Sequence, residues 1–112
     1  MSVEMWMVRA VKAYPEAHNH LLLGQVTRRD DVHIEMDCRV YDFGRGVASI
    51  RDVRQSEIRT RIIPWSRVEV IDVLPANFDY PEAKLEMTDV GDILISDGSN
   101  AFPIIESRGA IY

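Results

Sequence analysis

The sequence predicts an all-β protein, a small, strongly bent antiparallel barrel followed by further short strands. The first observation is residues 32–40, VHIEMDCRV, in which apolar and polar residues alternate without interruption. A period of two over nine residues is typical of a strand with one buried and one solvated face. The second observation is that other short strand-like stretches lie at close spacing with turn residues between them, as in small barrels and sandwiches.

The first half of the chain predicts three strands. Residues 3–13 fit either a helical stripe or a strand, and we interpret them as a strand that ends before Pro15. Residues 21–27 form a second, in which Gly24 predicts a sharp bend or a close approach of another backbone. The polar turn at 28–31 leads into the alternating strand, whose Cys38 lies on the apolar face. We therefore expect Cys38 to be a small buried hydrophobe and not a nucleophile.

The second half predicts further strands joined by short connections. Residues 47–56 form a variable connection, either a hairpin tip or a helical turn. Residues 57–63 alternate, with Ile58, Thr60 and Ile62 opposite Arg59 and Arg61. The short link at 64–67 makes the chain turn back sharply into a strand at 68–74. Two or three short strands are expected beyond it, the last two joined by the hairpin turn Asp97–Asn100: Leu85–Met87, Asp92–Ser96 and Phe102–Glu106.

Length and charge suggest one domain in two parts. A chain of 112 residues builds one modest core. Residues 1–74 are expected to form the barrel, and residues 75–112 an acidic extension of short strands packed as part of the same domain. Residues 28–67 hold nine arginines against seven acids, whereas residues 68–112 hold nine acids against two basic residues. The net charge of −5 disfavours non-specific nucleic-acid binding, so any RNA site has to be local.

The sequence predicts a cytoplasmic protein with no membrane contact. It has no run of the roughly 20 apolar residues that a membrane helix needs. Its first ten residues lack the basic region and the cleavage site of a signal peptide. With a single cysteine, no intramolecular disulfide forms, and a reducing compartment is the simplest expectation.

Two stretches resemble the Sm-like family of ring-forming RNA-binding proteins. The resemblance covers about residues 3–74. Gly24-Gln25-Val26, Asp31 and residues 32–37 match the first family motif, a glycine in the second strand, an acidic turn and a long alternating strand. Residues 62–71, IIPWSRVEVI, match the second motif loosely, as two short strands split by a tight loop. The resemblance implies a five-stranded Sm-like (SH3-type) barrel that forms a homo-oligomeric ring through its edge strands.

The resemblance also implies a site for single-stranded RNA, although the family's uridine-binding positions match poorly. Val32-His33 stands where the family has a methionine or histidine followed by asparagine, and Pro64 to Arg67 replace the usual Arg-Gly pair. Aromatic rings stack on bases and arginines contact phosphates. Six residues are therefore the candidate RNA-binding residues: His33, Trp65, Arg67, Arg28, Arg29 and Arg61.

The alternative hypothesis is a structural assembly module with no nucleic-acid role, which the missing Arg-Gly pair and the acidic charge favour. We expect no enzymatic activity, because no serine or cysteine has convincing partners. We also expect neither a cofactor nor a metal. His18 and His20 place two imidazoles on one strand face, but two ligands are too few and no acid at a telling spacing completes the set.

Overall fold

The computed structural model describes residues 3–106 and is all-β, with antiparallel sheets. Residues 107–112 of the expected C-terminal extension lie outside this range. The first sheet contains β1 (Glu4–Ala10), β2 (Asn19–Arg29), β3 (His33–Phe43), β4 (Arg54–Gln55), β5 (Arg59–Pro64) and β6 (Val68–Leu74). The second contains β7 (Lys84–Met87), β8 (Ile93–Ser96) and β9 (Ala101–Ile105). Three short 3-10 helices connect strands: η1 (Ile50–Asp52), η2 (Trp65–Arg67) and η3 (Tyr80–Glu82).

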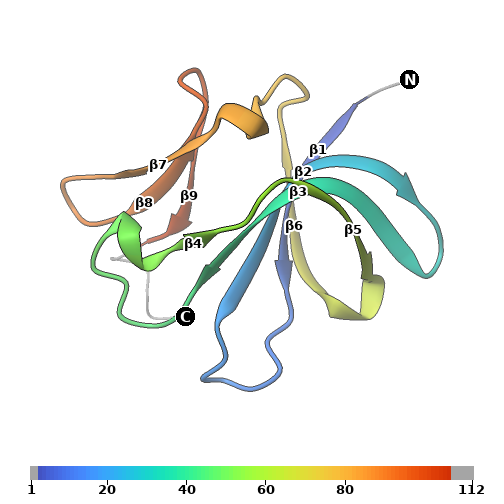
Figure 1. The fold of residues 1–112 in the computed structure, drawn as a ribbon, viewed down its shortest axis with the longest axis horizontal. Coiled ribbons are helices and arrows are strands. Elements are labelled where there is room, and N and C mark those ends of the chain that lie inside the picture. Colours follow the sequence, from blue (N-terminus) through green and yellow to red (C-terminus); the bar gives the residue numbers. More distant parts are fainter. Residues whose placement is uncertain (1–2, 107–112) are drawn as a thin grey trace.

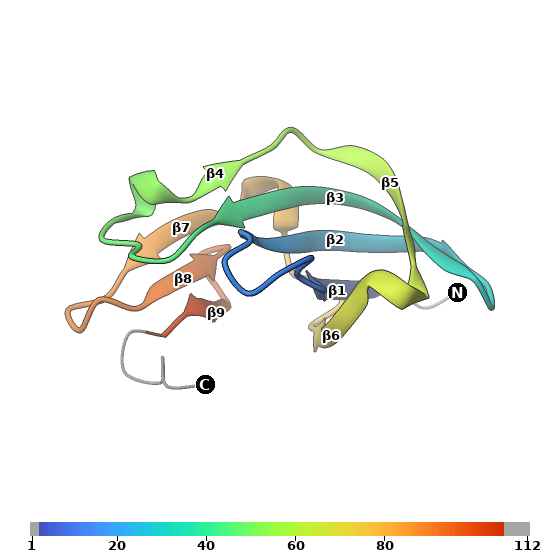
Figure 2. The ribbon, with the colours of Figure 1, turned by 90° about the horizontal axis from the view of Figure 1, so that it is seen from below.

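The two longest strands, β2 and β3, organise the first sheet. The strand order is β4-β3-β2-β1-β6, and β5 also pairs with β3. β3 is long enough for two partners, since its residues 33–38 pair with β5 and its residues 41–42 pair with β4. The second sheet packs beside the end of β3, while the β2–β3 turn projects at the opposite end of the molecule (Figures 1 and 2).

The alternating strand is confirmed and runs on to Phe43. Ile34, Met36 and Cys38 are fully buried, as expected for one dry face. Val32 is outside the strand and 66% exposed, because it belongs to the preceding turn. Tyr41 and Phe43 are buried on the opposite face, where the second sheet covers this end of β3.

The first sheet separates two hydrophobic clusters. The inner cluster lies on its concave face and contains Trp6, Val8, Leu22, Ile34, Met36, Cys38 and Ile63. The inter-sheet cluster joins its other face to the second sheet, and includes Met5, Met7, Leu21, Leu23, Tyr41, Ile93 and Ile95. β1 alternates between the two clusters, so nearly all of its side chains are apolar. This two-sided burial explains why residues 3–13 show no clear strand period.

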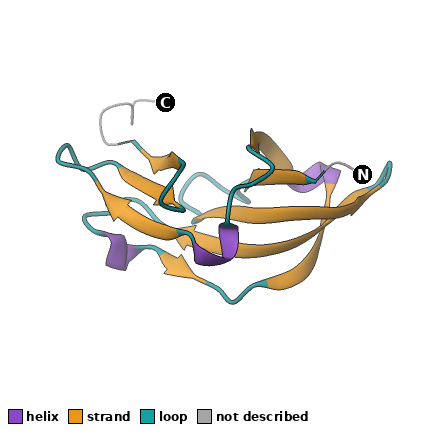
Figure 3. Cartoon of the chain, turned by 90° about the horizontal axis from the view of Figure 1, so that it is seen from above, coloured by secondary structure: helices purple, strands orange, loops and turns teal. Residues whose placement is uncertain are grey.

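The closed five-stranded barrel that we expected is absent from residues 3–106. β5 pairs only with β3 and β6 only with β1, so no ladder joins the two edges. η2 connects them, and Figure 3 shows the chain turning there between strands of the same sheet. Trp65, Val68 and Ile71 pack against the inner cluster at this opening. Side chains therefore cover the core where a barrel would use strand pairing.

β5 is a strand as predicted, and its core side is the face of Ile63. Ile63 is buried in the inner cluster, whereas Ile62 is 56% exposed. Arg61 lies on the same face as Ile63, and its guanidinium donates hydrogen bonds to the main-chain carbonyls of Cys38 and Glu57. The isoleucine that alternates with the arginines therefore faces solvent.

The predicted close approach at Gly24 is confirmed. A Cβ at Gly24 would overlap the carbonyl oxygen of Asp37 and the backbone of Cys38 on the neighbouring strand. Strands β7, β8 and β9 fall close to the three predicted after residue 83. The turn between β8 and β9 closes with a bond from the Asp97 N–H to the Asn100 carbonyl, as its hairpin chemistry predicted.

Candidate functional site

The β2–β3 turn is built around the side chain of Asp30. Its Oδ1 accepts hydrogen bonds from the main-chain N–H groups of Val32 and His33, at 2.8 and 2.9 Å. Aspartate favours such turns because its carboxylate reaches the N–H groups two and three residues ahead. These two bonds lower the pKa of the Asp30 carboxyl below its ordinary value, and the bond from the His33 N–H has the larger effect. The turn is therefore anchored by a carboxylate that stays ionised.

His33 and Trp65, two of the predicted RNA-binding residues, converge on this turn. The indole Nε1–H of Trp65 donates to the Asp30 carbonyl oxygen at 2.7 Å, and the Trp65 N–H donates to the Val32 carbonyl. The His33 Nδ1 lies 3.3 Å from Asp30 Oδ2. Both rings are partly exposed. Residues 32 positions apart thus form one aromatic surface at the end of the molecule, which we call the turn surface (Asp30, Val32, His33 and Trp65).

Arg28 and Arg29 lie next to the turn surface but are paired with acids. Arg28 Nη2 is 3.6 Å from Glu35 Oε1, in the register pair that joins β2 to β3. Arg29 Nη2 is 3.0 Å from Glu4 Oε1, and its guanidinium lies 5.3 Å from the ring centre of Trp6. Both arginine side chains are more than half exposed. Exposed pairs of this kind are weak, so the cations remain accessible to a phosphate.

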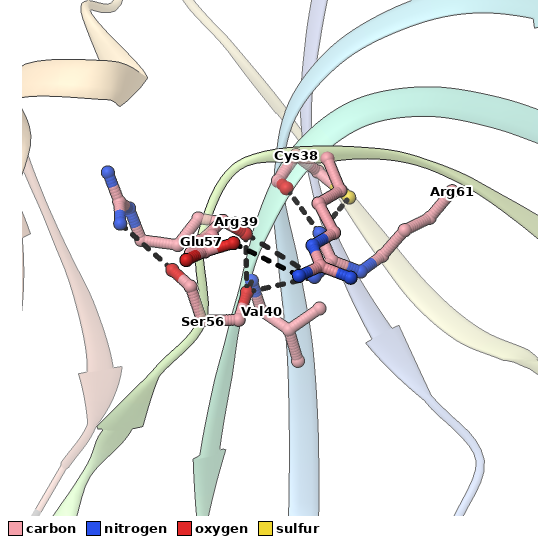
Figure 4. A network of polar contacts seen from close by, with 7 residues as sticks. Cys38, Arg39, Val40, Ser56, Glu57 and Arg61 are labelled. Carbon is pink, nitrogen blue, oxygen red and sulfur yellow. Dashed lines mark hydrogen bonds and ion pairs between the residues drawn. The ribbon is translucent and has the colours of Figure 1, made fainter.

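Arg61 belongs to a polar network on the side of β3 (Figure 4). Its Nη1 donates to the Cys38 carbonyl at 2.5 Å, and its Nη2 donates to Ser56 Oγ at 3.1 Å. Arg39 donates to the Ser56 carbonyl at 2.9 Å in the same network. These bonds fasten the segment before β5 onto β3. The Arg61 guanidinium is therefore held between β3 and the segment before β5, apart from the turn surface.

Arg67, the remaining candidate RNA-binding residue, ends η2. Its Nη2 donates to the Val11 carbonyl at 3.4 Å, away from the Asp30 turn.

Cys38 is fully buried, and burial raises the pKa of its thiol, so the thiol stays protonated at neutral pH. This confirms the expectation that Cys38 is a core residue.

Two edges of the first sheet pair with no further strand within residues 3–106, one on β5 and one on β6. Both edges expose large apolar side chains, with Ile62 56% exposed on β5 and Val73 74% exposed on β6. On β5, the side chain of Arg59 is 68% exposed, and its Nη2 lies 3.0 Å from Oε2 of the exposed Glu57. On β6, Glu69 and Asp72 are exposed. The edges thus combine apolar surface with an arginine on β5 and two acids on β6.

A groove of about 1130 Å³ lies between the β1–β2 connection, β6 and β9. A second hollow of about 370 Å³ shares Asp72, Pro103 and Glu106 with it. No sequence pattern indicated this groove, because its walls come from segments far apart in the chain. Its outer wall is formed by residues 11–15 and Asn19.

The histidines at 18 and 20 acquire a carboxylate partner that sequence spacing did not reveal. Asp42 lies 24 residues after His18, yet the β2–β3 register places it directly opposite His20. Across the described part of the chain, no group of three or more His, Cys, Asp or Glu side chains is arranged to hold a metal ion. His18 Nδ1 is hydrogen bonded to Asp42 Oδ1 at 2.7 Å, and His20 Nε2 lies 3.5 Å from Asp42 Oδ2.

Comparisons of the chain with protein-family models, with curated proteins and with solved structures found no match. None of the helices within residues 3–106 is long and apolar enough to cross a membrane.

Proposed function

We propose that this chain is a self-assembling module of Sm-like topology, in which β5 of one copy pairs with β6 of the next. The observation that carries the proposal is the complementary pair of free edges. Each edge presents unpaired backbone groups, which are a template for another strand. Because β5 and β6 are different surfaces, the contact is heterologous, and repeated contacts close a ring if the rotation between copies permits.

Topology supports the Sm-like part of the proposal. β1, β2, β3, β5 and β6 follow one another as the five strands of the resemblance, and a 3-10 turn separates the last two. The opening between β5 and β6 leaves both edges available to other copies. The charge supports the polarity of the contact, since Arg59, whose ion pair with Glu57 is exposed and therefore weak, would face Glu69 and Asp72 of the next copy.

Charge reversal on each edge tests this contact. One variant carries Arg59→Glu on β5, and the other carries Glu69→Arg with Asp72→Arg on β6. Each variant alone places like charges across the contact, so we expect each to be monomeric in sedimentation velocity. A one-to-one mixture restores opposite charges at both kinds of contact and is expected to reassemble. Asp31→Asn, on the β2–β3 turn, is the control and should assemble as the wild type does.

Wild-type assembly that both edge variants retain would contradict the proposal. Variants that stay monomeric in the mixture would also contradict it, because the lost assembly would not then depend on complementary edges.

A second candidate function is binding of single-stranded RNA at the turn surface. The observation that favours it is the convergence of His33 and Trp65 beside the exposed Arg28 and Arg29. Stacking of a base on an aromatic ring contributes about 1–3 kcal/mol. We therefore expect His33→Ala to weaken binding of a short uridine-rich RNA by about tenfold in fluorescence anisotropy.

Arg67 and Arg61 distinguish the candidate contacts. The Arg67 guanidinium lies away from the turn surface, so Arg67→Ala should weaken RNA binding and flatten its salt dependence where the RNA backbone runs on from Trp65 along η2. Arg61 is held in the β3 network, so Arg61→Lys should act on stability more than on the salt slope. An RNA affinity that none of the His33, Trp65 and Arg67 variants changes would leave assembly as the function.

A further inference from the structure

Strand register shows which side chains of β6 face the second sheet. Met7 of β1, which is buried in the inter-sheet cluster, is paired with Asp72 of β6, and Arg9 is paired with Val70. Side chains paired across neighbouring strands share a face of the sheet, so Val70 and Asp72 lie on the side of the inter-sheet cluster. We call this side the outer face. Leu74 also lies on it and is buried, whereas Val70 is exposed.

The large groove reaches β6, the edge strand of the first sheet. Val70 and Asp72 line the groove on β6, and Pro103 and Ile105 line it on β9. Within residues 3–106, β6 pairs only with β1, so its other edge is open to a further strand. A strand added to this edge would extend the outer face, and its outer side chains would lie beside Val70 and Asp72.

Ile62 is an apolar side chain that β5 exposes on the same face. It is paired with Glu35, which lies between Ile34 and Met36 of the inner cluster. Because side chains alternate along a strand, Glu35 and its partner Ile62 lie on the outer face. Ile62 is more than half exposed there. β5 thus presents a large apolar group to solvent on the face that contains the groove.

We propose that the groove binds Ile62 of the next copy, between Val70 on β6 and Pro103 and Ile105 on β9. The proposal rests on the assembly function, because it concerns the contact of β5 with β6. Val70 is the neighbour on β6 because it is apolar and exposed, whereas Asp72 is charged. Contact between Ile62 and Val70 removes apolar surface of both copies from water, which stabilises the assembly.

The distribution of charge supports a second copy as the occupant. Glu69 and Asp72, the acids that β6 contributes to the groove, are exposed on the edge strand. The cations of the groove, Arg9 and Lys12, lie on β1 and in the β1–β2 connection, behind that edge. An entering strand therefore meets the acids, and this favours a strand that carries arginine, as β5 does with Arg59.

Thiol cross-linking tests the position of Ile62. A mixture of Ile62→Cys and Val70→Cys chains is treated with a short bismaleimide, and Ile62→Cys with Val73→Cys is the matched control. Val73 is an exposed valine of the same strand, but its partner Trp6 belongs to the inner cluster, so Val73 lies on the other face. We expect several times more cross-linked dimer from the Val70 mixture than from the control. The wild type gives the background from the buried Cys38.

Sedimentation velocity of the same samples separates this proposal from the assembly function. Mixtures that assemble but cross-link no better at Val70 than at Val73 would overturn the binding of Ile62 in the groove and leave assembly through β5 and β6 in place. A monomeric wild type would overturn both.

Truncation of Ile62 provides a second measurement that needs no introduced cysteine. We expect Ile62→Ala to raise the dissociation constant of the assembly about tenfold, because fewer apolar groups are buried in the contact. Ile50→Ala is the matched control, since Ile50 is an exposed isoleucine on η1, outside β5 and β6, and its truncation should leave the constant unchanged. An Ile62→Ala chain that assembles as tightly as the wild type would overturn the proposal.

Discussion

The indole of Trp65 is hydrogen bonded to the main-chain carbonyl of Asp30, at 2.7 Å from Nε1 to the oxygen. This bond ties η2 to the β2–β3 turn across the open side of the sheet. The Trp65 N–H to Val32 carbonyl bond runs beside it. Together they continue the β3–β5 pairing beyond Pro64 and fix η2 against the turn, although no strand pairing joins β5 to β6 within residues 3–106.

Replacement of Trp65 by phenylalanine removes the side-chain bond and keeps an aromatic ring. We expect Trp65→Phe to lower the free energy of unfolding by about 1 kcal/mol, the usual net value of one hydrogen bond. Urea denaturation measures this change. Tyr14→Phe is the control, because Tyr14 is 60% exposed, and its effect should be near zero. Equal stabilities of Trp65→Phe and the wild type would show that the bond is not a tether.

Acid is expected to destabilise the fold through two turn aspartates. Hydrogen bonds from main-chain N–H groups lower the pKa of both carboxyls. The largest effect on the pKa of Asp30 comes from the N–H of His33, and the largest effect on the pKa of Asp97 comes from the N–H of Asp79. A carboxyl whose pKa is lower in the folded than in the unfolded protein stabilises the fold at pH values above its unfolded pKa of about 3.9. This stabilisation is lost as the pH falls through the pKa of the folded state. The urea midpoint should therefore fall below about pH 4. Asp97→Asn has no such proton to bind, so its midpoint should fall less; a fall as large as that of the wild type would exclude Asp97 as a source.

Gly24 is expected to be intolerant of any side chain. Gly24→Ala drives a methyl group into the backbone of β3 at Asp37 and Cys38, and overpacking of this kind costs about 3 kcal/mol. Gly46→Ala is the matched control, since a methyl group there meets open space and only the positive φ of 71° is strained. That strain costs about 1 kcal/mol. Thermal unfolding of the two variants checks the order, and a smaller loss for Gly24→Ala would show that β2 and β3 can separate there.

The two isoleucines of β5 should respond very differently to truncation. Ile63 is buried in the inner cluster, so Ile63→Ala is expected to cost about 3 kcal/mol of stability. Ile62 is 56% exposed, and Ile62→Ala should change stability by less than about 0.5 kcal/mol. Chemical denaturation of the dissociated protein measures both. The opposite order would show that Ile62, and not Ile63, contributes to the core.

The strands could be predicted because their local patterns agree with their burial. β6 begins and ends where the sequence predicts, and the alternation at 32–40 gives the buried face of β3. The alternation in β5 does not give its buried face, because Arg61 is satisfied by carbonyl groups on neighbouring backbone, which a one-dimensional pattern does not contain. A pattern of polar and apolar residues treats Arg61 as solvent-facing, although its side chain lies on the same face as the buried Ile63.

The candidate site was only partly predictable for the same reason. His33 and Trp65 could be named as aromatic residues in turns, but their meeting point at Asp30 depends on the β3–β5 register. Asp42 was missed as a partner of His18 and His20, because strand register and not sequence spacing brings it there. Barrel closure also depends on the angle between β5 and β6, which no residue pattern encodes.

Head-to-tail assembly would join β5 of one copy to β6 of the next. Native mass spectrometry of the wild type, the two edge-reversed variants and their equimolar mixture measures this assembly. We expect a wild-type oligomer of defined size, monomers for each variant alone, and mixed oligomers that contain both variants after mixing. A wild-type protein that is monomeric under these conditions would contradict it.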